Sequence, residues 1–361
     1  MKLILAFAGL AAADSITNAV QAIETLNSVW YSTATGLWDN AWWESACALT
    51  TIADFAHLRP QEARNIKFSA NAQSTFAQAQ KTTAQRKRAF QNVRRGYEEF
   101  IDRFYDDEGH WAIALLKAFD ATHDERYLNA AVDLFNDMQT GRGTPCKGGI
   151  FWSKDRTYVN AVANELYLAV AASLALHIPS NGTYLTIARD QWEWFAHSGL
   201  INSKGLINDG LDGDCNNNGL PTWSYNQGII LGGLTDLAKA TGNRGYITHA
   251  LRIARRAIAA LSNENGILEE VDKCELKGGH CGIDGKTFKG IFVRNLRYLY
   301  DAAPQGDIRA FVLRNADSVW KNARDPKTGK LGVAWTGPYV EATGPSHGSA
   351  LDVLVAAIAV Q

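Results

Sequence analysis

Residues 41–57 read AWWESACALTTIADFAH, and apolar or small side chains recur there at every third or fourth position, as Trp42, Leu49 and Ile52 illustrate. That spacing places these side chains on one face of an α-helix. Residues 160–175 follow the same period. Alternating runs of β-branched residues, the usual pattern of strands, do not occur along the sequence. The sequence therefore predicts an all-α protein.

The helical segments also recur along the chain. Six of them pair a polar or aromatic cluster with a following run of small and apolar residues. These segments begin near Trp42, Asp106, Val159, Trp223, Phe288 and His347. Separations of roughly 50 to 65 residues match the length of two helices with two connections. Amphipathic stretches such as 246–261 and 308–322 lie between the clusters and have the pattern of outer helices.

Six helical hairpins that close into a ring give an (α/α)6 toroid, and this is the predicted fold. An open solenoid is the alternative, although its repeats should resemble one another more closely in length and sequence. No linker composition interrupts the pattern, so residues 14–361 are predicted to form one domain. The inner helices of a toroid converge at one end. We expect the first turns of these helices, and the loops before them, to line a shared cleft.

The bulk composition narrows the class of ligand. Lys and Arg total 36 against 37 Asp and Glu, and the net charge of −1 does not suggest the basic surface that nucleic acids require. The chain holds 11 Trp, 12 Tyr and 14 Phe. Aromatic faces can stack on sugar rings, although core packing is the default for any single one of them.

No metal or cofactor is predicted. HExxH, Walker, GxGxxG and GxSxG patterns are absent from the sequence, and the eight His residues have no ligand spacing. Four residues fit the first half of a calcium-binding loop: Asp214, Asn216, Asn218 and Gly219. The twelfth position of such a loop should be Glu, and here it is Tyr225. A structural loop of turn-forming residues is the preferred interpretation.

The N-terminus has the features of a secretory signal peptide. Lys2 is followed by apolar residues 3–10 and by three alanines at 11–13. Residues 1–13 are therefore predicted to be removed, with an apolar first helix of the domain as the alternative. The apolar run is too short to span a bilayer, and the last residues lack the pattern of a lipid-anchor signal. The expectation is a secreted, soluble monomer without membrane contact, and the glycosylation acceptor Asn181 in Asn-Gly-Thr agrees with it.

The five cysteines suit an oxidising compartment. Cys274 and Cys281 would close a short loop, and Cys146 and Cys215, both in glycine-rich loops, are a second possible pair. Cys47 lies within an apolar helical run and is predicted to be a buried free thiol. Spacing alone does not fix the connectivity, so both pairings are hypotheses.

The segment FYDDEGHW, beginning at Phe104, holds three acids among four aromatic side chains, His included. Acids favour the positive end of a helix dipole, and this structural interpretation accounts for Glu108 and one Asp. The functional interpretation is a catalytic pair, Asp106 and Asp107. A retaining glycoside hydrolase needs an ionised nucleophile and a protonated acid/base about 5–5.5 Å apart. Repulsion between neighbouring carboxylates raises one pKa and leaves the other low, which separates these roles.

Polar clusters at two other helix starts have both a ligand-binding and a structural interpretation. One cluster combines the aromatic and amide groups that suit sugars, or caps the helix that follows: Trp223, Tyr225, Asn226 and Gln227. Asn160 and Asn164 lie on one helix face four residues apart. These two amides could contact a ligand or form a buried hydrogen-bonded pair.

Several aromatic residues are candidates for the cleft wall. Trp42, Trp43 and Phe288 stand at helix starts, where they could line the cleft or pack in the core. Tyr105 and Trp111 flank the acid pair and could help to bury one carboxyl group.

Six segments, in this order, resemble the α-1,6-mannanases of glycoside hydrolase family 76, and most closely the secreted fungal members. The segments are YDDEGHWAIALLKAFD (105–120), NAVANELYLAVAA (160–172), SGLINSKGLINDGLD (198–212), CNNNGLPTWSYNQGIILGGL (215–234), NGILEE (265–270) and FKGIFVRNLRYL (288–299). The resemblance extends from about Trp42 to about Tyr300. It implies an (α/α)6 fold and retaining endo-hydrolysis of α-1,6-linked mannan, the backbone of fungal cell-wall mannoproteins.

The resemblance also implies roles for single residues. The adjacent acids of the family fall on Asp106 as nucleophile and Asp107 as acid/base. Five further positions are suggested as substrate contacts: Asn164, Tyr225, Asn226, Gln227 and Lys289. His110 departs from the family pattern, since many relatives have Trp there. This puts a stacking contact or the shape of the cleft in doubt, but not the carboxylate chemistry.

Alternative functions stay open. Membrane-anchored relatives in the same family imply transglycosylation of glycolipid-anchored mannoproteins, with the same acid pair. A carbohydrate-binding protein without turnover would keep the aromatics and amides, but it would not need Asp106 beside Asp107. Other toroid enzymes need acidic metal-binding motifs or a catalytic His and Tyr arrangement that this sequence lacks.

Overall fold

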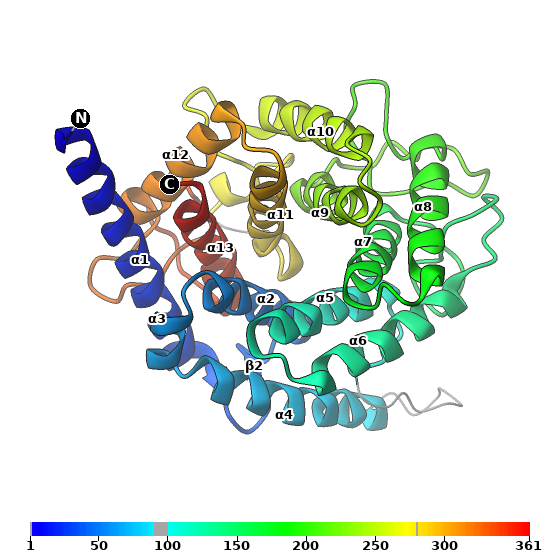
Figure 1. The fold of residues 1–361 in the computed structure, drawn as a ribbon, viewed down its shortest axis with the longest axis horizontal. Coiled ribbons are helices and arrows are strands. Elements are labelled where there is room, and N and C mark those ends of the chain that lie inside the picture. Colours follow the sequence, from blue (N-terminus) through cyan, green and yellow to red (C-terminus); the bar gives the residue numbers. More distant parts are fainter. Residues whose placement is uncertain (1, 90–99, 279–280) are drawn as a thin grey trace.

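The computed structural model describes residues 2–89, 100–278 and 281–361, and its helices form two concentric rings (Figure 1). The inner ring consists of α2 (Trp42–Leu58), α5 (Tyr105–Thr122), α7 (Ala161–His177), α9 (Ser224–Thr241), α11 (Phe288–Ala302) and α13 (Gly344–Val360). Each inner helix contacts the next one along the chain, and α13 contacts α2, so the ring is closed. The predicted (α/α)6 toroid is confirmed, and the open solenoid is excluded.

The outer ring covers the inner one. It consists of α1 (Lys2–Trp30), α4 (Phe68–Ala89), α6 (Glu125–Met138), α8 (Gly182–His197), α10 (Gly245–Leu261) and α12 (Gly306–Asn322), with the short α3 (Pro60–Asn65) between α2 and α4. The remaining elements are β1 (Tyr31–Ser32), paired antiparallel with β2 (Leu37–Trp38), and three 3-10 turns, η1 (Gln139–Gly141), η2 (Cys274–Leu276) and η3 (Asp284–Lys286).

Burial explains which helices lie inside. Residues 161–175 of α7 are all buried, because an inner helix packs against two inner neighbours and against outer helices as well. Helix α10 buries one stripe at helical spacing, from Ile247 to Leu261, and leaves its other face to solvent. The sequence pattern therefore separates inner from outer helices.

Two glycines allow the inner helices to approach closely near their first turns. A Cβ at Gly228 of α9 would lie 2.5 Å from the Cα of Phe292 in α11. A Cβ at Gly290 of α11 would lie 2.6 Å from the Cα of Ser349 in α13. These contacts draw the starts of α9, α11 and α13 together, which is the end of the ring where the site lies.

Both predicted disulfides are present, between Cys146 and Cys215 and between Cys274 and Cys281, and Cys47 is a buried free thiol as predicted. In the part of the chain that the structure describes, no helix combines the length and the apolar character needed to cross a bilayer. The signal peptide at residues 1–13 stays a prediction. The structure places residues 2–13 in helix α1.

Candidate active site

A cavity of about 390 Å³ opens where the inner helices begin. Its walls come from the first two turns of α2, α5, α9 and α11 and from the loops before α5, α7, α9 and α11. The lining residues are Trp43, Phe104, Asp106, Asp107, His110, Trp152, Tyr158, Asn160, Asp209, Tyr225, Asp284 and Phe288. The expectation of a shared cleft at the helix starts is confirmed.

Asp106 and Asp107 stand side by side in the first turn of α5 and both line this cavity. The loop before α7 fixes their orientation. The backbone N–H of Tyr105 donates to the carbonyl of Trp152 at 2.9 Å, and the Trp152 indole Nε1 donates to Asp106 Oδ2 at 3.0 Å. The second oxygen of Asp106, Oδ1, is enclosed and has no hydrogen-bond partner among the described residues. One oxygen of Asp106 is therefore held by the Trp152 indole, whereas the other is buried without a partner among the described residues.

The surroundings of Asp106 shift its acidity strongly. Burial raises the pKa of Asp106 to about 7, the Trp152 hydrogen bond opposes this shift, and the negative charge of Asp284 adds to it. Asp107 is the adjacent residue, and both carboxyl groups line the same cavity. A pair that holds one proton near neutral pH can supply both an acid and a base.

Glu108, the third acid of this segment, has a structural role. Its carboxylate is buried behind the cavity, where it accepts from Lys154 Nζ at 2.6 Å and from the Asp102 backbone N–H at 3.0 Å. Lys154 also pairs with Asp137 at 2.6 Å. This network fastens the loop before α7 to the start of α5, and therefore positions Trp152 beside Asp106.

Aromatic rings and acids form the rest of the wall. Tyr225 stacks on Phe288 with ring centroids 4.0 Å apart, and Trp43 stacks on His110 at 4.9 Å. Asp209 accepts the Tyr158 hydroxyl at 2.6 Å. Of the described residues that line the cavity, four are aspartates and none is Lys or Arg. Such a wall suits a ligand with apolar faces and hydroxyl donors, as a sugar has.

His110 departs from the family pattern, and its surroundings show whether a stacking contact is lost at this position. Burial lowers the pKa of His110 to about 3, with a further contribution from the positive charge of Arg294. The imidazole is therefore neutral at physiological pH, and it stacks on Trp43 as an aromatic ring would. The cleft wall at this position stays aromatic in character.

Of the nine predicted substrate contacts, only Tyr225 lines the cavity. Trp42, Tyr105 and Trp111 are buried in the core: the Trp42 and Trp111 rings pack together at 5.5 Å, and the Tyr105 hydroxyl bonds to Thr140. Trp223 is half-buried and packs against Phe288 outside the lining. None of these four aromatics is among the residues that line the cavity, which favours the core-packing alternative for Trp42, Tyr105 and Trp111.

The amides lie in the wall behind the cavity, and their hydrogen bonds show why. Asn164 is fully buried and exchanges hydrogen bonds with both the N–H and the carbonyl of Ile150, at 2.7 and 2.9 Å. Gln227 makes the same pair of bonds with Ile207, at 2.8 and 2.7 Å. Each amide fastens the loop before its own inner helix. Asn226 is also fully buried, and neither polar atom of its side chain has a partner among the described residues.

Lys289 also lies away from the cavity. Its side chain is 1% exposed and its Nζ donates to Glu275 at 2.8 Å and to the carbonyl of Val333 at 2.9 Å. The hydrogen bonds of Lys289, Asn164 and Gln227 thus support the structural interpretation of these three residues. A substrate contact by Asn226 stays a prediction.

Five lining residues were not selected from the sequence: Phe104, Trp152, Tyr158, Asp209 and Asp284. All of them precede an inner helix on its connecting loop. Asp209 reaches the cavity because the N–H of Ala161 donates to its carbonyl at 2.8 Å, which lays that loop across the start of α7. The rule that loops before inner helices line the cleft, if applied residue by residue, would have found them.

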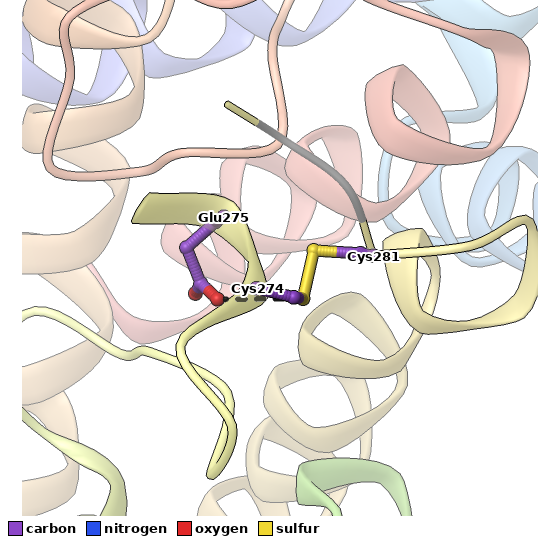
Figure 2. A group of neighbouring side chains, drawn as sticks. All are labelled: Cys274, Glu275 and Cys281. Atoms are coloured by element: carbon purple, nitrogen blue, oxygen red, sulfur yellow. Dashed lines mark hydrogen bonds between the residues drawn. A yellow bond between two sulfur atoms is a disulfide. The ribbon is translucent and has the colours of Figure 1, made fainter. Parts of the chain in front are cut away.

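One group of metal-ligating residue types lies close together in the described parts of the chain. Cys274, Glu275 and Cys281 lie close enough to share an ion, but the two sulfurs are joined in a disulfide (Figure 2) and Glu275 is paired with Lys289. In the loop considered for calcium, Asn218 donates to the Tyr158 hydroxyl at 2.9 Å. Its side chain thus supports the cavity wall.

Replacement of Trp152 by phenylalanine is expected to lower kcat/KM about 10- to 100-fold, since hydrogen bonds to charged groups contribute about 1.5–3 kcal/mol. The indole N–H stabilises the ionised form of Asp106, so its loss raises the pKa of Asp106. In a plot of kcat/KM against pH, the acid limb should therefore move to higher pH. Trp194→Phe is the control, because that indole donates to the Cys146 carbonyl outside the cavity. An unchanged profile for Trp152→Phe would contradict the role assigned to this hydrogen bond.

Comparison with known proteins gives a consistent result. The family model for glycosyl hydrolase family 76 matches residues 10–360. The mannan endo-1,6-alpha-mannosidase DFG5 of Saccharomyces cerevisiae is 29% identical over 250 residues, which cover 64% of this chain and 54% of that protein. The mannan endo-1,6-alpha-mannosidase DCW1 of Candida albicans is 26% identical over 250 residues, covering 64% and 55%. The chain spans about half the length of these relatives.

Solved structures share the fold. An inactive variant of the α-1,6-mannanase GH76A of Salegentibacter sp. HEL1_6, with two adjacent aspartates changed to asparagine and in complex with α-1,6-mannotriose, matches with a TM-score of 0.81 at 20% identity, covering 96% of this chain and 100% of that one. Dfg5 of Chaetomium thermophilum, in complex with glucosamine, matches with a TM-score of 0.71 at 20% identity, covering 89% and 80%. Since the family model matches nearly the whole length of the chain, this protein is a member of glycosyl hydrolase family 76.

Proposed function

We propose that this protein is a retaining endo-hydrolase of α-1,6-mannosidic linkages in mannan. The observation that carries the proposal is the pair Asp106 and Asp107 in a cavity lined by aromatic rings and carboxylates. The names of the related yeast proteins, and the mannotriose bound to a structural neighbour, support α-1,6-mannan as the substrate.

The proposed reaction has two steps. The carboxylate of Asp106 attacks the anomeric carbon while Asp107 protonates the departing glycosidic oxygen, which gives a covalent mannosyl-enzyme. Asp107 then takes a proton from water, and this water attacks the anomeric carbon and releases Asp106. These roles require the proton of the pair to sit on Asp107 when the sugar is bound. The Trp152 indole favours that distribution, since it stabilises the ionised form of Asp106.

The protein is expected to release short manno-oligosaccharides from unbranched α-1,6-mannan. Products are separated by chromatography over time, and a spread of lengths early in the reaction marks internal cleavage. The anomer released first, followed by NMR, should be α, because two displacements restore the configuration. Mannan that is left intact, or a β anomer as first product, would contradict the proposal.

Transfer to a sugar acceptor is the second candidate. A covalent mannosyl-enzyme can be attacked by a hydroxyl of another sugar as well as by water. The observation that favours transfer is the glucosamine bound to Dfg5 of Chaetomium thermophilum, since a cavity with four aspartates would attract an amino sugar. Elongated products that form only when an acceptor sugar is added would identify transfer as the main reaction.

We also propose that the protein acts outside the cytosol as a monomer. The predicted signal peptide at 1–13 and the exposed acceptor Asn181 at the start of α8 support export. The two disulfides agree with an oxidising compartment.

A further inference from the structure

Asp284 is a carboxylate in the cavity that neither the sequence patterns nor the proposed reaction assigns. It begins η3, on the loop before α11, and it lines the same cavity as Asp106 and Asp107. Its Oδ1 accepts a hydrogen bond from the indole Nε1 of Trp43 at 3.1 Å. Trp43 belongs to α2, so this bond joins the two sides of the cavity rim across 241 positions of sequence.

The loop that carries Asp284 is anchored at both ends. On one side, Cys274 is bonded to Cys281 (Figure 2). The neighbouring Glu275 is 1% exposed and paired with Lys289 in the first turn of α11. On the other side, the backbone N–H of Thr287 donates to the carbonyl of Asp284 at 2.9 Å, directly before α11 begins. We call the Cys274–Cys281 disulfide together with the Glu275–Lys289 ion pair the loop clamp.

Building on the proposed function, we infer that Asp284 binds substrate by accepting hydroxyl hydrogen bonds from a mannosyl unit, and that the loop clamp holds it in the cavity.

The chemistry of the rim supports this inference. An ionised carboxylate has about four acceptor positions, and the Trp43 indole occupies one of them. No Lys or Arg is among the described residues that line the cavity, so no cation there competes for the others. Mannose units linked through C1 and C6 keep free hydroxyls at C2, C3 and C4, and hydroxyls are donors. The rings of Trp43 and Phe288 beside Asp284 offer faces for the apolar side of a sugar.

The charge of Asp284 also acts on the proposed nucleophile. Burial is the main cause of the raised pKa of Asp106, and the charge of Asp284 adds to it. The other titratable groups that line the cavity are Asp107, His110, Tyr158, Asp209 and Tyr225. Removal of the Asp284 charge should therefore lower the pKa of Asp106 and move the acid limb of the kcat/KM profile to lower pH. A residue that only supported the loop would not produce this shift.

The test uses Asp284→Asn in two settings. In the catalytically inactive Asp106→Asn background, the Kd of α-1,6-mannotriose is measured by calorimetry, and we expect Asp284→Asn to raise it about 10- to 100-fold, as for a lost charged hydrogen bond. In the otherwise native enzyme, kcat/KM on α-1,6-mannan should fall by a similar factor with the stated shift in pH profile. Asp133→Asn is the matched control, because Asp133 is an exposed residue of the outer helix α6 and does not line the cavity.

The loop clamp is tested by a double-mutant cycle. The combined variant Cys274→Ser/Cys281→Ser should weaken mannotriose binding in the same direction, because the loop is no longer fixed. Adding Asp284→Asn to that variant should raise the Kd of mannotriose by a smaller factor than it does when the disulfide is intact. If Asp284→Asn raises the Kd by the same factor in both backgrounds, the loop clamp does not hold Asp284 in the cavity.

An unchanged Kd for Asp284→Asn, together with an unchanged pH profile, would overturn the inference for Asp284 itself. Failure of the proposed reaction is a separate result. If the native protein binds mannotriose in an Asp284-dependent way but cleaves no mannan, then the inference stands and the hydrolase assignment fails.

Discussion

Asp106→Asn and Asp107→Asn are each expected to abolish most mannan hydrolysis. Loss of a general acid–base group lowers kcat about 10²- to 10⁴-fold, and loss of the nucleophile should cost at least as much. The reason is that an amide can neither attack the anomeric carbon nor transfer a proton at these positions. Initial rates on unbranched α-1,6-mannan measure the effect.

Folding has to be preserved in both variants for this result to be informative. Burial raises the pKa of Asp106, so the folded protein stabilises the neutral acid over the carboxylate. A carboxyl group whose folded pKa is raised destabilises the fold as pH rises from its unfolded value through about 7, and a neutral amide avoids that cost. The melting temperature of Asp106→Asn at pH 8 should therefore be equal to or above that of the native protein. Full activity in either variant would show that the active site lies elsewhere.

The separate roles of the two acids can be assigned with alanine variants, an activated aryl α-mannoside and azide. If Asp107 is the acid/base, Asp107→Ala still forms the mannosyl-enzyme, and azide then gives the α-mannosyl azide. If Asp106 is the nucleophile, azide attacks the substrate directly in Asp106→Ala and gives the β-mannosyl azide. The opposite pattern would exchange the two assignments.

Lys289→Met is expected to destabilise the protein by about 3–5 kcal/mol, since removing one partner of a buried ion pair leaves an uncompensated buried charge. Lys289 and Glu275 are each 1% exposed and lie 2.8 Å apart, so the carboxylate of Glu275 would lose its only described cation. Chemical denaturation gives the free energy of unfolding. The control is Lys321→Met, in a pair with Asp317 whose side chains are 66% and 60% exposed, and it should change stability by less than about 1 kcal/mol.

The Lys289→Met variant also distinguishes a substrate-contact role of Lys289 from a structural role. The family resemblance suggested that it touches substrate, whereas the structure places it behind the wall. A variant with native stability and a greatly raised KM would restore the substrate-contact interpretation. A destabilised variant that recovers when Glu275 is also changed to Gln would support the structural one.

Much of the fold could be predicted from sequence because each inner helix has a local signature. Helices buried on all sides need small and apolar residues around their whole circumference, and their polar groups concentrate at the first turn, where unpaired backbone N–H groups and the cleft both lie. All six predicted starts fall within three residues of an observed inner helix. The Asp pair could likewise be singled out from residue type and order, whereas the two disulfide pairings were only hypotheses until the structure confirmed them.

The residues that line the cavity could not be predicted in the same way, because residues of one helical turn point in several directions. In α5, Asp106, Asp107 and His110 line the cavity while Glu108 and Trp111 point into the protein. Each set has helical spacing. Only the rotation of the helix within the ring, fixed by packing against its neighbours, decides which set faces the cleft.

The same physical reason separates Tyr225 from Asn226 in α9 and Phe288 from Lys289 in α11. The sequence by itself determined the all-α ring, the helix starts and the acidic pair, because these depend on local period and residue type. Tertiary structure alone decided the roles of Trp152, Asp209 and Asp284. Their loops cross from one helix start to another, and contacts between residues far apart in sequence leave no local pattern.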